Sequence, residues 1–268
     1  ASGERRWRYQ SQVPALTVRA ASSMRFSPAG ILVGQSNGRL LALDGQGKTI
    51  FDIVVAQPKG ITEVERLCDV VGTPLVDQNM MCAAAFQGGI LCISAKDGRP
   101  LWRASVDAVS GPVTDGRVYV TTSRGEINAY DYATGELVWQ NSALLWRSPS
   151  AVAVLDEVIA VGDYDGVVHF LDPKTGKFVG RTSVDGAVRV PPISLGNGAI
   201  FQGNIHGHVA GKALGGGGEH IGAGGSGRGQ GAVNGIHRGL GADGGAGHAV
   251  NAIAQGEGTG LADKLGGE

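Results

Sequence analysis

Hydrophobic and polar residues alternate along much of this chain with the period of two that is typical of β-strands. In the run EINAYDY, Ile127 and Ala129 would face one side of a strand and Tyr130 the other. Such runs are separated by pairs such as Asn37-Gly38 and Asp165-Gly166, which favour tight hairpins because glycine adopts positive φ angles at little steric cost. No helical period interrupts these runs before about residue 214, so the pattern predicts an all-β fold.

The alternating pattern recurs in four copies. They are ILVGQSNGRLLALDGQGKTIFDI from Ile31, MMCAAAFQGGILCISAKDGRPLWRA from Met80, VYVTTSRGEINAYDYATGELVWQN from Val118, and VIAVGDYDGVVHFLDPKTGKFVGR from Val158. Each copy has a glycine at its hairpin and a second glycine nine or ten residues later. Four positions beyond that stand Phe51, Trp102, Trp139 and, in the fourth copy, Gly180. Strand-only repeats of roughly 40 residues are typical of β-propeller blades, in which such an aromatic covers apolar surface between neighbouring sheets.

Both ends of the repeat region contain pieces of further blades. In ASGERRWRYQ, Gly3 stands four residues before Trp7, which predicts the last turn and outer strand of a blade. The stretch ISLGNGAIFQGNIHGHVAG, from Ile193, supplies the inner strands of another. We therefore expect a partial β-propeller of quinoprotein-like blades, with about four complete repeats between two partial ones. Either it is an arc of a larger ring, or the two partial pieces join as one composite blade and close a small ring.

The composition changes abruptly near Gly211, which divides the chain into propeller blades over residues 1–214 and a glycine-rich tail over 215–268. Such a tail cannot bury enough apolar surface to offset its ordering entropy, so we expect it to be disordered, or to be an artefact such as a translated wrong reading frame. Irregular spacing argues against metal binding by the histidines at and beyond His208, which are His208, His220, His237 and His248.

Charge and cysteine content exclude several classes of function. The formal net charge of −1 favours neither nucleic acid nor an anionic membrane surface. No apolar run approaches the ~20 residues that cross a bilayer, and no signal peptide stands at Ala1, so the targeting segment of an exported protein would lie upstream. Cys68, Cys82 and Cys92 lack the CxxC spacing of a metal or redox site, so we interpret them as small buried hydrophobes. The sequence predicts no metal site and no cofactor.

Three segments outside the repeats carry a resemblance to a known family. They are VPALTVRAASS (13–23), TEVERLCDVVGTPLV (62–76) and LLWRSPSAVAVLDEVIAVGDYDGVVHFLD (144–172). With them, residues 4 to about 214 resemble the C-terminal part, somewhat over half, of the BamB family, the propeller lipoproteins of the outer-membrane β-barrel assembly machinery of Gram-negative bacteria. The resemblance implies an eight-bladed ring whose N-terminal blades are missing here, held by an N-terminal lipid at the periplasmic face of the outer membrane.

The resemblance also implies a function and a set of partner-binding residues. It implies a non-enzymatic scaffold that binds the periplasmic POTRA domains of the barrel-forming subunit, chiefly the third, with unfolded outer-membrane proteins as conceivable further partners. The residues carried over are Leu16, Val18 and Arg19 in a first loop and Asp69 in a second. The family often has a second acidic residue where this chain has Val71, which puts one polar contact of the interface in doubt.

The residues of the second loop are compatible with that role without the resemblance. The connection between Phe51 and Met80 is longer than the later ones, and long loops on a rigid scaffold often carry binding residues. Its charged residues include Glu65 and Arg66, which surround apolar positions and form a mixed surface suited to a partner. The alternative is a solvated loop whose apolar residues pack onto the ring.

Two other functions compete with the scaffold. A quinone-dependent dehydrogenase is built from similar blades, but such enzymes have adjacent cysteines near the cofactor, and this chain has no Cys-Cys pair. The acidic residues Asp97, Asp165 and Asp172 fall in turns, where capping of the local backbone explains them. A ligand-sensing propeller of an exported protein is the second alternative, and it would bind a small ligand rather than a POTRA domain.

Overall fold

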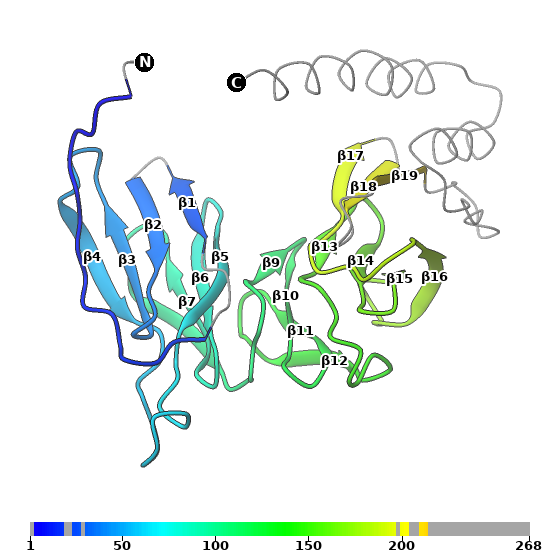
Figure 1. Cartoon of the computed structure of the whole chain (residues 1–268), viewed down its shortest axis with the longest axis horizontal. Coiled ribbons are helices and arrows are strands. Elements are labelled where there is room, and N and C mark those ends of the chain that lie inside the picture. Colours follow the sequence, from blue (N-terminus) through cyan, green and yellow to red (C-terminus); the bar gives the residue numbers. More distant parts are fainter. Residues whose placement is uncertain (1–2, 19–22, 28–29, 197–198, 204–208, 214–268) are drawn as a thin grey trace, which may run out of the picture. The chain divides into compact units, whose positions relative to one another are not determined.

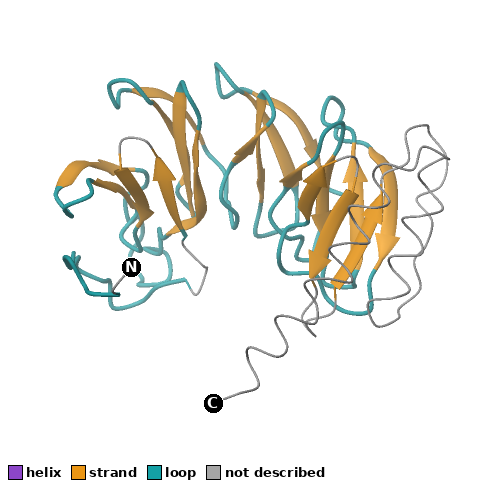
Figure 2. Cartoon of the chain, turned by 90° about the horizontal axis from the view of Figure 1, so that it is seen from above, coloured by secondary structure: helices purple, strands orange, loops and turns teal. Residues whose placement is uncertain are grey.

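The computed structural model describes residues 3–18, 23–27, 30–196, 199–203 and 209–213, and every regular element in them is a strand (Figures 1 and 2). The expected tail, 215–268, lies outside the described residues. The chain divides into two compact units, 1–146 and 147–268. The all-β prediction is confirmed for the described part of the chain.

Three four-stranded antiparallel sheets make up the first unit. The first contains β1 (Met24–Ser27), β2 (Gly30–Gly34), β3 (Arg39–Leu43) and β4 (Thr49–Val54). The second contains β5 (Val70–Val76), β6 (Met80–Ala85), β7 (Gly89–Ser94) and β8 (Pro100–Ala104). The third contains β9 (Val113–Thr114), β10 (Arg117–Thr121), β11 (Ile127–Asp131) and β12 (Leu137–Asn141). Each is a meander in which consecutive strands pair, as the blade pattern predicts.

The second unit continues the same plan. A four-stranded sheet contains β13 (Ala153–Val154), β14 (Ile159–Gly162), β15 (Val167–Leu171) and β16 (Phe178–Ser183). A three-stranded sheet contains β17 (Ile193–Gly196), β18 (Ala199–Gly203) and β19 (Val209–Ala213). These five sheets are the four complete repeats and the partial C-terminal repeat expected from the sequence.

The hydrophobic core of the first unit lies between the faces of successive sheets. One cluster joins the first two sheets and includes Leu40 and Leu91, both almost fully buried. A second cluster joins the second and third sheets and includes Ile90 and Val118. Burial of these faces against one another is what fixes each sheet beside the next.

Indole rings join one repeat to the next in the way that the anchor positions predict. Trp102, on β8, is 7% exposed and covers Gly135 so closely that a Cβ there would come within 2.4 Å of the ring. Its Nε1 donates to the carbonyl of Tyr132 at 2.9 Å. Trp7 makes the corresponding contacts with the turn after β3, donating to the carbonyl of Gly45 at 2.9 Å.

Residues 3–12 form no strand in the structure, which corrects the expectation of an outer strand there. A strand requires a neighbour to pair with, and no neighbouring strand is present for this segment within the described residues. Trp7 nevertheless occupies the anchor position, as the spacing from Gly3 indicated.

In each four-stranded sheet of the described residues, the fourth strand contains a β-bulge immediately before its anchor position. The register shifts opposite Ala42, Cys92, Ala129 and Phe170 leave one extra residue in β4, β8, β12 and β16. These extra residues are all exposed aliphatic side chains, namely Ile50, Leu101, Val138 and Val179. Bulges interrupt the regular edge of a sheet, so they protect the blade edges against pairing with other chains.

A disulfide bond joins Cys82 on β6 to the directly opposite Cys92 on β7, with their Cα atoms 4.1 Å apart. Cys68 is a free, buried thiol. The interpretation of all three cysteines as small buried hydrophobes is therefore correct for Cys68 and incomplete for the other two. Disulfides form and persist in oxidising compartments, so this bond is suited to an exported protein.

Alkylation should distinguish the three cysteines. In the oxidised protein, iodoacetamide under denaturing conditions without reductant should modify one thiol, Cys68, because the other two cysteines form the disulfide. After reduction it should modify all three. Mass spectrometry of the peptides measures both states, and three modified cysteines without reductant would contradict the bond between β6 and β7.

Candidate functional site

Two connections on the first unit carry the residues expected to bind a partner: the loop that precedes β1 and the connection between β4 and β5. In the first, Leu16 is 43% exposed and Val18 is half-buried, whereas Arg19 lies outside the described residues. In the second, Glu65 and Arg66 are exposed. This second connection projects from the first unit as the cyan loop at the lower edge of Figure 1.

The buried side chain of Asp69, in the second connection, is hydrogen-bonded to the first. It is only 4% exposed, and its Oδ2 accepts a hydrogen bond from the backbone amide of Val18 at 2.7 Å. Its own carbonyl accepts from the amide of Phe86 at 2.9 Å. The carboxylate therefore positions the first loop and is not itself presented to solvent.

Burial governs the ionisation of this carboxyl. Oδ1 of Asp69 is buried and has no hydrogen-bond partner within the described part of the chain. Desolvation raises the pKa of Asp69, and the hydrogen bond from the Val18 amide acts in the opposite direction without cancelling it. A buried carboxylate with an unpaired oxygen lowers the stability of the fold. Groups that destabilise a fold in this way are commonly retained at functional positions.

The exposed part of the second connection is ordered by a capping box. Oε2 of Glu65 accepts from the amides of Thr62 at 3.0 Å and Ile61 at 2.9 Å, and Oγ1 of Thr62 accepts from the amide of Glu65 at 3.2 Å. The hydrogen bonds from these backbone amides, that of Thr62 first, lower the pKa of Glu65. Glu65 thus shapes the loop, while the nearby Arg66 is only loosely paired with Glu63, at 3.9 Å.

The capped turn presents apolar side chains that the sequence did not single out as binding residues. Ile61 is 96% exposed and Val64 is 60% exposed. We use the name apolar tip for the exposed apolar side chains that the two connections carry, Leu16, Ile61 and Val64. Because a rigid loop loses little entropy on binding, side chains held in this way are suited to contact another protein.

Val71 offers no polar contact at this surface. It is 1% exposed on β5 and packs in the cluster between the second and third sheets with Cys82 and Ala84. A carboxylate at this position would be buried among apolar groups, which is expensive without a partner. The burial of Val71 is in keeping with the doubt about a polar contact at this position, which stays a prediction.

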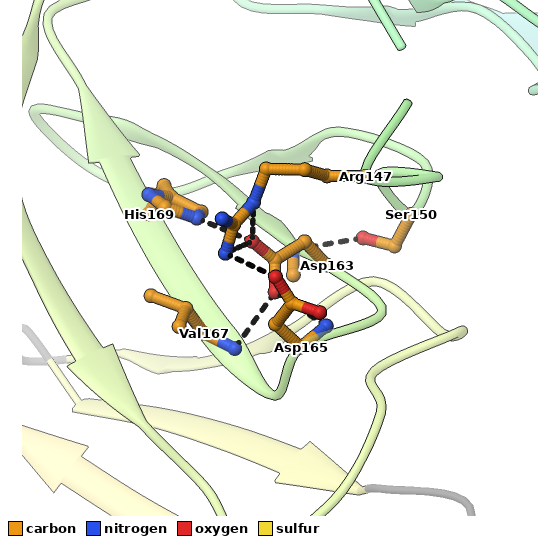
Figure 3. Close-up of polar contacts among 7 residues, drawn as sticks. Arg147, Ser150, Asp163, Asp165, Val167 and His169 are labelled. Carbon is orange, nitrogen blue, oxygen red and sulfur yellow. Dashed lines mark hydrogen bonds and ion pairs between the residues drawn. The ribbon is translucent and has the colours of Figure 1, made fainter. Parts of the chain in front are cut away.

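A second polar cluster lies in the second unit, around Asp163. Its fully buried carboxylate faces the guanidinium of Arg147 and the ring of His169 (Figure 3), with Oδ2 at 2.8 Å from Arg147 Nε, 2.7 Å from Arg147 Nη2 and 2.8 Å from His169 Nε2. Oδ1 accepts from the amides of Asp165 at 3.0 Å and Val167 at 2.9 Å. Burial alone would raise the pKa of Asp163, but the hydrogen bonds from His169, the Val167 amide and Arg147 outweigh it, so the pKa is lowered.

The cluster of Asp163, Arg147 and His169 stabilises the local fold, and we call it the brace. Both oxygens of Asp163 are fully used inside the protein, and Asp165 is turned outward to pair with Arg147 at 3.0 Å. Ser150 extends the brace by accepting from the amide of Gly162 at 3.0 Å. The brace therefore fixes the hairpin between β14 and β15 against residues 147–150.

Two of the three acidic residues expected to cap turns, Asp97 and Asp172, do so, whereas the carboxylate of Asp165 pairs with Arg147 instead. Oδ1 of Asp172 accepts from the amide of Lys174 at 2.8 Å, and Oδ1 of Asp97 accepts from the amide of Arg99 at 3.3 Å. Within the residues described above, no group of three or more His, Cys, Asp or Glu side chains is placed to hold a metal ion. No helix in that part of the chain is long and apolar enough to span a bilayer.

Comparisons with known proteins agree with one another. The family described as "Outer membrane protein assembly factor BamB" matches residues 1–141 and 88–199. Curated relatives of that name include one from Bordetella pertussis, 37% identical over 205 residues, and one from Burkholderia pseudomallei, 38% identical over 200 residues. These matches cover 75% and 73% of this chain but 53% and 52% of the relatives, so the chain spans about half the length of the curated relatives it matches.

Solved structures give the same result. The crystal structure of BamB from Moraxella catarrhalis matches with a TM-score of 0.72 and 27% identity, covering 76% of this chain and 62% of that one. A quinohemoprotein alcohol dehydrogenase from Pseudomonas putida matches with a TM-score of 0.54 but only 14% identity, which indicates a shared fold and nothing further. The described sheets are therefore blades of a β-propeller.

Proposed function

Because the chain belongs to the family of the outer membrane protein assembly factor BamB, we propose that it is a non-enzymatic scaffold subunit that binds the POTRA domains of the barrel-forming subunit. In this role it assists the folding and insertion of β-barrel proteins into the outer membrane. The intact protein would work at the periplasmic face of that membrane, held there by a lipid anchor.

The observation that carries this proposal is the hydrogen bond between the Val18 amide and Asp69. It joins two connections at residues that are 51 positions apart in the sequence, and these connections expose Leu16, Ile61 and Val64. Apolar side chains on a rigid frame with charged neighbours such as Arg66 have the composition of a protein-binding surface.

The dehydrogenase alternative has less support from the residues themselves. The carboxylates Asp97 and Asp172 cap turns, and that of Asp163 is saturated by internal hydrogen bonds. The two bonded cysteines stand opposite each other on neighbouring strands rather than adjacent in the sequence. A scaffold accounts for the exposed apolar tip, whereas an enzyme of this type does not require it.

Calorimetric titration with the isolated third POTRA domain tests the proposal. The wild-type chain should bind with saturation, and Leu16→Asp should weaken the affinity about tenfold or more, because it places a charge in the apolar tip. Val179→Asp is the matched control, since Val179 is also exposed, at 58%, but lies on β16. Loss of affinity in both variants, or in neither, would contradict a binding site at the two connections.

A further inference from the structure

The guanidinium of Arg103, on β8, binds the chain where the second connection begins. Its Nη1 donates to the carbonyl of Val55 at 2.8 Å, and its Nη2 donates to the carbonyl of Val54 at 3.0 Å. Val54 is the last residue of β4, so the two acceptors are successive carbonyls at the end of that strand. A guanidinium presents its donors in a rigid fork, which allows one side chain to bind both. Arg103 therefore joins the second sheet to the point at which the chain leaves the first.

The carbonyl of Val55 needs a donor that its own sheet does not supply. Val55 lies beyond the end of β4 and is only 1% exposed, so water has little access to its backbone. The amides of Val55 and Ala56 both donate to the carbonyl of Gly38, at 2.9 and 3.0 Å. A buried carbonyl without a donor is costly, and Arg103 removes that cost. The first residues of the second connection are therefore bound on both sides.

The other end of the second connection returns to the same place. The amide of Val70 donates to the carbonyl of Gln35 at 3.0 Å, and Sγ of Cys68 lies 3.0 Å from the position that a Cβ at Gly38 would take. Both ends thus contact the hairpin between β2 and β3. Residues 57–67 form a loop that is closed at its base, as in the compact loops that often carry function.

Arg103 differs in its contacts from residues at the same position of other repeats, the one after the aromatic anchor. In the first sheet this residue is Asp52, which pairs with Arg39 at 2.7 Å. In the third it is Gln140, whose Nε2 donates to Oδ1 of Asn128 at 3.1 Å. Both of these contacts stay within one sheet, whereas Arg103 reaches the connection that carries exposed apolar side chains.

We infer that Arg103 is a positioning residue for the proposed binding surface: by binding the carbonyls of Val54 and Val55, it keeps the second connection in the arrangement that presents Ile61 and Val64. This inference rests on the proposed function. Arg103 acts through the connection and does not itself contact the partner. A loop that is already ordered loses less entropy on binding, so the contacts at its base raise affinity.

Hydrogen exchange in the free protein tests the effect on the connection. Arg103→Met keeps the aliphatic stem and removes the donors. In this variant the amides of Val55 and Ala56 should exchange about tenfold faster, because local opening at the base becomes easier. The amide of Leu91, in the centre of β7, should exchange as in wild type. Arg103→Lys should recover part of the protection, since an ammonium group can still donate to a carbonyl.

Calorimetric titration of the full chain with the isolated third POTRA domain tests the effect on binding. Arg103→Met should bind about fivefold more weakly than wild type, because the partner must then order the loop, and Arg103→Lys should recover much of the loss. Arg99→Met is the matched control. It removes the same charge from a side chain that is 84% exposed and pairs with Asp97 at 3.3 Å, in the turn before β8. Its affinity should equal that of wild type.

The outcomes separate the inference from the function on which it rests. Equal affinity of wild type and Arg103→Met overturns the inference and leaves the proposed function standing. A loss of affinity without faster exchange at Val55 and Ala56 also overturns it, because Arg103 would then contact the partner directly. An equal loss in Arg99→Met overturns it in favour of a general effect of charge. Failure of the wild-type chain to bind the domain overturns both the proposed function and the inference.

Discussion

Replacing Trp102 by alanine should lower the free energy of unfolding of the first unit by about 3 to 5 kcal/mol, the range found for large aromatic truncations in a core. Its ring is 7% exposed, packs beside Tyr130 with centroids 6.4 Å apart, and covers Gly135 on the next sheet. Truncation removes this contact and leaves a cavity between the second and third sheets. The measurement is urea unfolding followed by tryptophan fluorescence.

One control variant separates the contribution of the ring from that of its hydrogen bond. Trp102→Phe keeps most of the apolar volume and loses the bond to the carbonyl of Tyr132, so it should cost about 1 kcal/mol for that bond, plus a smaller packing loss. All four tryptophans of the chain lie within residues 1–146, so the fluorescence reports the first unit. A loss below about 1 kcal/mol for Trp102→Ala would mean that the indole does not seal the contact between the two sheets.

Removing the Asp163 carboxylate should destabilise the hairpin between β14 and β15 by about 3 kcal/mol. In Asp163→Ala the buried His169 loses its partner and the amides of Asp165 and Val167 lose their acceptor. Arg147 is 36% exposed, so water can partly replace its lost ion pair, which keeps the estimate at the lower end for a buried pair. Hydrogen exchange at amides in the centre of the sheet, such as that of Phe170, should become roughly a hundredfold faster.

The effect of this substitution should depend on pH. Because the folded protein holds the pKa of Asp163 below its usual value of 3.8, the carboxylate stabilises the fold at pH values above 3.8, and that contribution is lost as the pH falls through the lowered pKa. The difference between wild type and Asp163→Ala should therefore shrink below about pH 3.8. Asp165→Ala, in which an exposed carboxylate is removed, should change stability by less than about 1 kcal/mol. Equal effects of the two substitutions would contradict the brace.

The sequence predicts the blades well because two local signals agree in every copy. Turn glycines such as Gly38 and Gly135 have positive φ in the structure, at 76° and 72°, and the alternating runs between the turns became strands. The shortest innermost strands, β9 and β13, contain two residues each and leave no detectable pattern. The aromatic anchor residues could be identified because their distance from the preceding turn glycine is a local feature of the sequence. Trp102 and Trp7 make the expected contacts with the next turn.

The candidate site was less accessible to sequence reasoning because it depends on contacts between distant residues. The sequence around Asp69 does not indicate that its carboxylate is buried and accepts a hydrogen bond from the amide of Val18, because the two residues are far apart in the chain. Predicting the disulfide from the sequence would have required the register of β6 and β7, which places Cys82 directly opposite Cys92. The Thr62 to Glu65 spacing is a capping-box signal that was present in the sequence, and it would have marked the turn that exposes Ile61.

Hydrogen exchange with and without excess third POTRA domain tests the central claim most directly. Binding should slow exchange of the amides in residues 13–18 and 57–67 and leave β14, β15 and β16 unchanged, because the two connections joined by Asp69 form the proposed contact surface. Protection confined to another part of the chain, or binding without protection of either connection, would contradict the account.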